Sequence, residues 1–307
     1  MIDCVLVVVA YNSATDLPSL LNSVDAAARD LTWQAIVVNN SPAEDLTDLL
    51  AAFPNVSLLE PGENLGYSGG LNLGVRAAPD CRYFTFLNPD LKLGPGALTT
   101  LLHELERSPS ATAAVPAIQT MDNHTRTSIR REPSILGSLG EALFGNGWPS
   151  RPAVLTEVVR DPADYGYIHA IDWATGAALV VRSEAVATIG DWDALTFFLY
   201  SEEVDYSRRI REAGGQVMFV PESVVHHVEG GSGSAPALLA LMEVNRVRYY
   251  RKWHGPRKTP LYALVVLAHN TLRLHRPGRT LAIKALCSPK VRATLPHASR
   301  NRQARQW

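Results

Sequence analysis

Apolar residues in the first third of the chain form short continuous runs that alternate with runs at helical spacing. Val5 to Val9 is an uninterrupted β-branched run, as expected of a strand buried on both faces of a parallel sheet. Similar patterns predict strands over 35–38, 56–59 and 83–87, and helices over 17–24, 46–53 and 71–78, the first after a capping box at Ser13 to Asp16. This alternation predicts an α/β fold whose mostly parallel central sheet is flanked by helices.

The pattern changes after residue 110. Residues 111–164 are less regular and rich in Pro, Gly and Arg, which favours a substrate-facing excursion over a core segment. A second structured block runs from 171 to 225, with a strand over 178–182, helices from Ser183 and near Glu202, and a strand over 216–220. At 307 residues the chain is long enough for one large domain with an appendage.

Composition is that of a globular protein, with 46% hydrophobic and 19% charged residues. The three cysteines, Cys4, Cys81 and Cys287, are too scattered for a disulfide framework or a metal site. Residues 1–3 lead directly into the first strand, without the basic region of a signal peptide. We therefore expect a reduced, cytoplasmic protein.

Charge divides the chain into two parts. Residues 244–307 contain 15 of the 29 Lys and Arg residues and none of the 30 Asp and Glu residues. The apolar run 261–268 within this part is too short to span a bilayer, but it suits a helix lying at an anionic membrane surface. The alternative is a basic helical cap packed on the main domain. The predicted division is a domain of 1–243 and a basic helical C-terminal segment of 244–307.

A carboxylate follows the predicted strand 83–87 directly. The run ends in Asn88-Pro89-Asp90, which presents Asp90 at the carboxyl edge of the sheet, where open α/β sheets bind ligands. Taken alone, the same three residues are equally consistent with a simple turn. His226 and His227 end a later strand, and imidazole with carboxylate is a plausible ligand set for Mn²⁺ or Mg²⁺.

Glycines are concentrated between the third predicted strand and the helix after it, over residues 64–74. Glycine at such a junction lets backbone amides approach a phosphate or sugar. The segment lacks the Lys-Ser/Thr of an ATP-binding loop. Gly66 to Gly70 matches the Gly-x-Ser-x-Gly elbow of serine hydrolases, but residues 60–64 separate it from its strand, so a hydrolase is disfavoured.

Three carboxylates, Glu202, Glu203 and Asp205, stand at the predicted start of a helix. The helix dipole alone favours carboxylates there, which would make them a charged cap. The aromatic run 197–200 before them would hold them close to the core, where crowded carboxylates shift one another's pKa and one can act as a base. We favour the catalytic interpretation.

These elements occur in a recognisable order. The motifs are Ala10-Tyr11-Asn12, Val38-Asn39-Asn40-Ser41, Asn64-Leu65-Gly66-Tyr67, Leu87-Asn88-Pro89-Asp90, Thr175-Gly176-Ala177, Glu202-Glu203-Val204-Asp205 and His226. Together they resemble the inverting glycosyltransferases of family 2, which have the GT-A fold, and most closely the rhamnosyltransferase-like branch. The resemblance covers about residues 1–234.

The resemblance implies roles for individual residues. Residues 1–110 would bind the nucleotide sugar and 165–235 would form the acceptor and catalytic half. The implied donor-binding residues are Ala10, Tyr11, Asn12, Asn39, Asn64, Gly66, Tyr67 and Asn88. Asp90 and His226 would hold a divalent Mn²⁺ or Mg²⁺, and Glu203, in a cluster with Glu202 and Asp205, would be the general base. Trp173, Gly176 and Tyr200 are expected at the acceptor or sugar site.

The chain departs from the family pattern at three positions. Asn88 replaces the first Asp of the Asp-x-Asp element, Glu203 replaces the Asp of the usual Glu-Asp pair, and Asn39 replaces the usual base-reading Asp. A dTDP- or UDP-sugar donor is therefore an expectation, and either Glu202 or Glu203 could be the base.

The expected protein is an inverting glycosyltransferase that moves rhamnose or a similar sugar to a glycan or lipid-linked acceptor. It would act peripherally at the inner face of the membrane. An inactive sugar-nucleotide-binding protein of the same fold is the alternative, which Asn88 would suit. Nucleic-acid binding is disfavoured because the basic segment lacks a regular pattern of aromatic residues for stacking.

Overall fold

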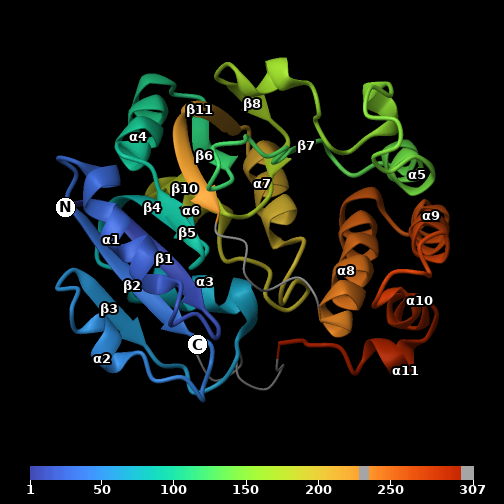
Figure 1. Cartoon of the computed structure of the whole chain (residues 1–307), viewed down its shortest axis with the longest axis horizontal. Coiled ribbons are helices and arrows are strands. Elements are labelled where there is room, and N and C mark those ends of the chain that lie inside the picture. The colour runs from blue at the N-terminus through green and yellow to red at the C-terminus, as the bar shows by residue number, and fades with distance from the viewer. Residues whose placement is uncertain (228–234, 299–307) are drawn as a thin grey trace.

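In the computed structural model, which describes residues 1–227 and 235–298, nine strands of the described part form a mostly parallel sheet in the order β3-β2-β1-β4-β10-β6-β11-β5, with β8 paired to β11 (Figure 1). The strands are β1 (Ile2–Ala10), β2 (Trp33–Asn39), β3 (Val56–Leu59), β4 (Cys81–Leu87), β5 (Leu91–Leu93), β6 (Ala111–Gln119), β8 (His169–Ile171), β10 (Ala178–Arg182) and β11 (Gln216–His227). β10, β5 and β8 run antiparallel to their neighbours. A separate ribbon pairs β7 (Ile129–Arg130) with β9 (Trp173–Ala174).

Helices cover both faces of this sheet, and a group of them lies to one side (Figure 1). They are α1 (Leu17–Ala28), α2 (Thr47–Leu50), α3 (Gly66–Ala77), α4 (Ala97–Arg107), α5 (Ile135–Leu143), α6 (Ser183–Ile189), α7 (Glu202–Glu212), α8 (Pro236–His254), α9 (Thr259–Thr271), α10 (Arg279–Cys287) and α11 (Pro289–Arg292), with 3₁₀ turns η1 (Ala153–Leu155) and η2 (Pro162–Tyr165). The group to one side consists of α5 and α8 to α11.

The first strand is buried on both faces, as its continuous apolar run predicts. Leu6 and Val8 pack in one core cluster with α1 and α4, whereas Val5 and Val7 pack in the other with Leu71 of α3. Successive side chains of a strand point to opposite faces, so an uninterrupted run of Val and Leu can supply both layers. The predicted α/β fold with a mostly parallel sheet is confirmed.

The glycines of residues 64–74 pack a helix closely against the first strand. Helix α3 begins at Gly66, so most of them are helical. A Cβ on Gly70 would lie 2.8 Å from Val9, and one on Gly74 would lie 2.3 Å from Val7. These glycines allow α3 to approach β1 closely, and the predicted helix start at residue 71 is wrong, because α3 begins at Gly66.

The start of α1 also differs from the prediction. Asp16 is the N-cap residue, but no side chain makes a capping hydrogen bond there. The amides of Ser13 and Ala14 instead donate to the carboxylate of Glu44, at 3.0 and 3.1 Å. A distant carboxylate therefore orders this turn in place of the local capping box.

The predicted division at residue 243 falls inside α8. The part of α8 that belongs to the basic segment packs on the residues around the start of α7. Tyr249 packs with Phe197 and Val204, and Lys252 lies 2.8 Å from the buried carboxylate of Asp205. α8 thus forms the packed cap that the charge pattern left as an alternative. In the described part of the chain, no helix combines the length and apolar character needed to cross a bilayer.

Candidate active site

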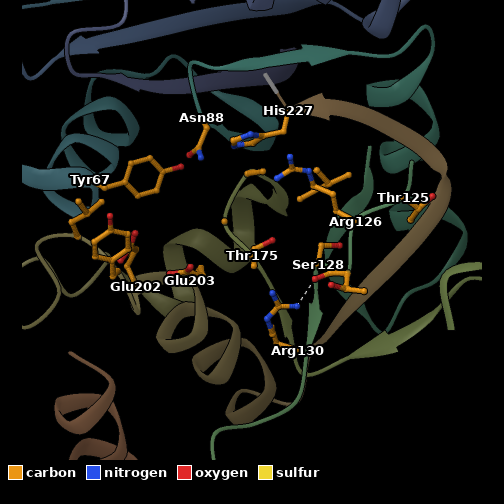
Figure 2. Close-up of a pocket in the computed structure, with 16 residues that line it drawn as sticks. Tyr67, Asn88, Thr125, Arg126, Ser128, Arg130, Thr175, Glu202, Glu203 and His227 are labelled. Atoms are coloured by element: carbon orange, nitrogen blue, oxygen red, sulfur yellow. Dashed lines mark hydrogen bonds between the residues drawn. The ribbon is translucent and has the colours of Figure 1, made fainter. Parts of the chain in front are cut away.

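A cleft of about 690 Å³ opens beside the carboxyl ends of β4, β6 and β11, and the amino end of α7 faces it (Figure 2). Because β10 runs antiparallel to β4, residues 175–177 enter the sheet at the same edge. The residues that line the cleft include Tyr67, Asn88, Thr175, Gly176, Tyr200, Glu202, Glu203 and His227, together with Arg126 and Arg130. The structure thus brings together motifs that are as far apart in sequence as Tyr67 and His227.

Hydrogen bonds fasten α3 to the segment that precedes α7. The amide of Tyr67 donates to Phe198 O at 2.8 Å, and the buried Ser68 hydroxyl donates to Phe197 O at 2.6 Å. Gly66 has φ +73°, and a Cβ there would lie 2.3 Å from Phe198 O. Glycine is required at this close contact. Because Ser68 is buried and bonded in this way, it is not placed as a hydrolase nucleophile.

Two consecutive non-glycine residues in the left-handed region, Tyr200 (φ 68°) and Ser201 (φ 70°), turn the chain into α7. Such residues persist where their surroundings hold them. The buried amide of Asn245 in α8 donates to Leu199 O at 2.9 Å and to Tyr200 O at 3.1 Å. A residue of the basic segment therefore fixes the turn that aims Glu202 and Glu203 into the cleft.

The two glutamates in the cleft differ in their surroundings. Burial raises the pKa of Glu202 well above its usual range, and the neighbouring Glu203 raises it further. Burial also raises the pKa of Glu203, but the amides of Glu203 and Gly176 and the guanidinium of Arg130 oppose this shift. Of two crowded carboxyls, the one whose charged form is better stabilised ionises first. The opposing interactions at Glu203 therefore favour it over Glu202 as the group that ionises.

The structure does not bring Asp205 or Trp173 into the cleft. Asp205 is 1% exposed, accepts from Trp253 Nε1 at 2.9 Å and lies 2.8 Å from Lys252 Nζ. The Trp173 indole donates to Arg131 O at 2.9 Å and packs beside Phe197. The predictions that placed them at the site are wrong, because both tie neighbouring segments together. Gly176 and Tyr200 do line the cleft.

The histidine beside Asp90 is His227, not the predicted His226. His227 Nε2 lies 3.4 Å from Asp90 Oδ2, and His227 lines the cleft. Adjacent strand residues point to opposite faces, and His226 Nδ1 lies 3.3 Å from Thr120 O instead. Burial raises the pKa of Asp90, and His227 partly offsets that increase.

Asp90 and His227 suit a divalent cation by their chemistry. Asp90 Oδ1 is buried without a hydrogen-bond partner among the described residues, as expected of an oxygen reserved for a ligand. In the described ranges, no cluster of three or more His, Cys, Asp or Glu could hold a metal. An ion held there would need oxygens from its substrate as well, which is common for Mg²⁺ bound to phosphates.

The residues expected to contact the nucleoside lie outside this cleft, after β1 and β2. Ala10 ends β1 in the core, and Tyr11 is 55% exposed. Asn39 is 1% exposed and donates through Nδ2 to Glu44 O at 2.7 Å and to Glu60 Oε1 at 3.0 Å. Both of its amide hydrogens are thus used within the protein, and its carbonyl oxygen accepts from the amide of Ser41 at 3.0 Å.

Two further asparagines shape the same edge of the sheet. Asn12 Oδ1 accepts from the hydroxyl of Ser41 at 2.6 Å, which joins the ends of β1 and β2. Asn64 Oδ1 accepts from the amide of Gly66 at 2.9 Å and so orders the start of α3. Both interactions organise the loops on which the predicted donor-binding residues lie.

Sequence reasoning missed the cationic wall of the cleft, which Arg126 and Arg130 form opposite the glutamates (Figure 2). Arg130 donates to Thr127 O at 2.5 Å and to Ile129 O at 3.1 Å. The arginine-rich composition of residues 111–164 was the available signal. It indicated a substrate-facing segment without indicating which arginines face the glutamates.

Comparisons with known proteins agree with this geometry. The family model described as glycosyl transferase family 2 matches residues 5–160. The chain is 30% identical over 243 residues to the N-acetylglucosaminyl-diphospho-decaprenol L-rhamnosyltransferase of Mycobacterium tuberculosis, covering 76% of this chain and 78% of that protein. It is 24% identical to the low-salt glycan biosynthesis hexosyltransferase Agl10 of Haloferax volcanii, over 68% of this chain and 62% of that one.

Solved structures show the same fold at low sequence identity. GalNAc-T7 with UDP, GalNAc and Mn²⁺ matches with a TM-score of 0.63 and 16% identity, over 87% of this chain and 51% of that one. The mannosyltransferase PcManGT of Pyrobaculum calidifontis with GDP-Man and Mn²⁺ matches with a TM-score of 0.54 and 16% identity, over 95% and 80%. The fold is GT-A, and the chain belongs to glycosyl transferase family 2.

Proposed function

We propose that this glycosyltransferase moves rhamnose or a related sugar from a dTDP- or UDP-sugar to a hydroxyl group of a lipid-linked acceptor, with inversion at the anomeric carbon. The observation that carries the proposal is the paired Glu202 and Glu203 at the start of α7, in one cleft with His227 and Asn88. The similarity to a rhamnosyltransferase named for a diphospho-decaprenol acceptor supports the choice of sugar and acceptor.

In the proposed mechanism, Glu203 accepts the proton of the acceptor hydroxyl as its oxygen attacks the anomeric carbon. The bond to the nucleoside diphosphate breaks on the opposite face of the sugar, which inverts the configuration. Glu202, held neutral by burial and by Glu203, would donate a hydrogen bond to the sugar or the acceptor. The rigid turn at Tyr200 and Ser201 keeps both groups in place before substrate arrives.

Asp90 and His227 would hold a divalent Mn²⁺ or Mg²⁺ at the donor diphosphate, where the ion would neutralise charge on the leaving group. The Mn²⁺ in both of the matched structures supports this choice. Asn88 lines the cleft beside them and would contribute an amide contact to the donor in place of a second carboxylate.

We further propose that the enzyme works at the inner face of the membrane. Its basic C-terminal segment, with 15 Lys and Arg and no Asp or Glu, would be attracted to anionic lipid, whereas the acidic remainder would be repelled. A lipid-linked acceptor would then be held close to the cleft.

Donor binding and sugar transfer test the proposed function directly. Thermal unfolding should be measured with UDP-, dTDP- and GDP-sugars, each with and without Mn²⁺. A dTDP- or UDP-sugar with Mn²⁺ should raise the melting temperature by several degrees, because a ligand stabilises the state that it binds. Transfer should then be measured to an N-acetylglucosaminyl-diphospho-lipid. Binding of a donor without transfer to any acceptor would favour the inactive binding protein.

Removal of the Arg130 charge should move the pH dependence of transfer. Glu203 acts as a base only when ionised, so kcat rises with pH through its pKa. Because Arg130 lowers that pKa, Arg130→Met should shift the acidic limb of the pH–kcat profile to higher pH. Arg126→Met, which removes a charge from the same wall nearer His227, is the matched control and should move this limb less (Figure 2). An unshifted profile in Arg130→Met would contradict the electrostatic coupling.

A further inference from the structure

Exposed apolar side chains are concentrated in two segments of the molecule. Of the fourteen large apolar residues that are widely exposed in the described part, nine lie within residues 136–154 and 261–274. Among them, Leu143 is 58% exposed, Leu264 60% and Leu272 56%. Single exposed leucines are ordinary, but such a concentration marks a surface that meets something apolar.

The two segments are neighbours in space, because α5 and α9 lie side by side (Figure 1). At one end, Ile135 packs against the cluster that Tyr262 and Val266 form with Tyr250. At the other end, Arg273 donates to Ala142 O at 2.8 Å and to Glu141 O at 2.9 Å. The rings of Phe144 and Trp148 meet edge to face, 5.1 Å apart, just beyond α5. We call Leu143, Phe144, Trp148, Leu264, Leu272 and Leu274 the α5–α9 face.

Helix α9 is apolar on two sides, which packing within the protein alone does not require. Tyr262, Val265 and Val266 are buried against the rest of the protein. Leu261 and Leu264 lie one helical turn apart on the exposed side, and the exposed Leu272 directly follows the last residue of the helix. The run that suggested an interfacial helix therefore supplies both a core contact and an outer apolar stripe.

In the part of the chain that the structure describes, most cations near this surface form no ion pair with a carboxylate. Of the Lys and Arg residues at 244–298, only Arg246, Lys252 and Arg279 form ion pairs with carboxylates among the described residues. Arg257 and Lys258 precede α9, Arg276 follows it, and all three are exposed. A second copy would bring the same positive charge to the contact and would be repelled. An anionic phospholipid surface offers an apolar layer and negative charge together.

We propose that the α5–α9 face inserts its apolar side chains into the headgroup region of an anionic phospholipid leaflet, with Arg257, Lys258 and Arg276 contacting lipid phosphates. The proposal rests on the proposed function and deepens it, since it names which surface meets the membrane and adds α5 and its following turn to the basic C-terminal segment.

Vesicle binding by the full chain tests the proposal. The protein is sedimented with phosphatidylcholine vesicles that contain or lack phosphatidylglycerol, at ~0.05 M and ~0.5 M salt. The double variant Leu143→Ser/Leu272→Ser removes two exposed leucines and should weaken binding to the anionic vesicles by about tenfold or more. The matched control, Tyr167→Ser/Leu195→Ser, changes side chains that are 51% and 55% exposed elsewhere and should bind like the wild type.

Fluorescence and association state add two independent readouts. Trp148 is 41% exposed, so anionic vesicles should shift the wild-type emission to the blue more than that of Trp148→Phe. Equal vesicle binding by the wild type and the double variant would overturn the proposal. So would a wild-type dimer that the double variant converts to a monomer while its vesicle binding is unchanged, since the face would then join two copies.

Transfer to a water-soluble, short-chain acceptor separates this proposal from the proposed function. The double variant should retain wild-type kcat with that acceptor and lose activity only on acceptors embedded in vesicles. If the wild type transfers no sugar to any acceptor but binds anionic vesicles through the α5–α9 face, the proposed function fails and the surface assignment stands. If the wild type transfers sugar but does not bind vesicles, the surface assignment alone fails.

Discussion

Glu203→Gln should lower kcat for sugar transfer by about 10³-fold, within the 10²- to 10⁴-fold range of general-base catalysis. The amide keeps the size of the side chain but cannot accept the acceptor's proton. The amides of Glu203 and Gly176 and the charge of Arg130 stabilise ionised Glu203. The substitution removes none of these groups, so we expect the backbone around residue 203 to stay unchanged. Steady-state kinetics on both substrates should show the loss in kcat, with KM for the donor little changed.

Glu202→Gln is the matched control, because Glu202 is adjacent, buried and in the same cleft. Burial and the charge of Glu203 both favour its neutral form, which an amide mimics. We expect kcat to fall by less than about tenfold. In the other variant, Glu203→Gln, loss of the negative charge at residue 203 should lower the pKa of Glu202. The reverse ranking of the two variants would assign the base to Glu202 and contradict the mechanism.

Much of the fold could be predicted from local patterns. The run Val5 to Val9 encodes a strand buried on both faces, and strand–helix alternation fixes the parallel sheet around it. Because the carboxyl ends of parallel strands share an edge, the positions after β1, β2 and β4 could be grouped without coordinates. Asn88, after β4, lines the cleft at that edge, whereas the residues after β1 and β2 lie outside it.

The remaining features depend on contacts between distant parts of the chain. Which of His226 and His227 reaches Asp90 depends on strand register, since a shift of one residue reverses the face. Asp205 resembles a site residue until α8 brings Lys252 and Trp253 onto it, 47 and 48 positions later. Likewise, no local pattern distinguishes a glycine that admits a ligand from Gly74, which admits the side chain of Val7.

Substitution of Asp90 by asparagine should reduce metal-dependent transfer by about 100-fold or more. The substitution removes the only carboxylate that the Asn88-Pro89-Asp90 element offers to a divalent ion. Thermal unfolding provides a readout apart from activity: the stabilisation that Mn²⁺ adds to a bound nucleotide sugar should be largely lost in Asp90→Asn. Asn88→Ala should be better tolerated, because the contact of Asn88 with Ala177 O is made by its backbone amide, at 2.9 Å. Full metal-dependent activity in Asp90→Asn would remove Asp90 from the metal site.

The two adjacent histidines test the same site by a different route. His227→Ala should raise the Mn²⁺ concentration needed for half-maximal transfer by about tenfold, in line with loss of one ligand or of its orienting partner. His226→Ala serves as its control, because the side chain of His226 lies near Thr120 O rather than near Asp90. Titration of activity against Mn²⁺ should therefore separate the two variants. The family resemblance selects His226 as the ligand, whereas the geometry selects His227. A weaker Mn²⁺ response in His227→Ala would support the geometry, and a weaker response in His226→Ala would support the motif position.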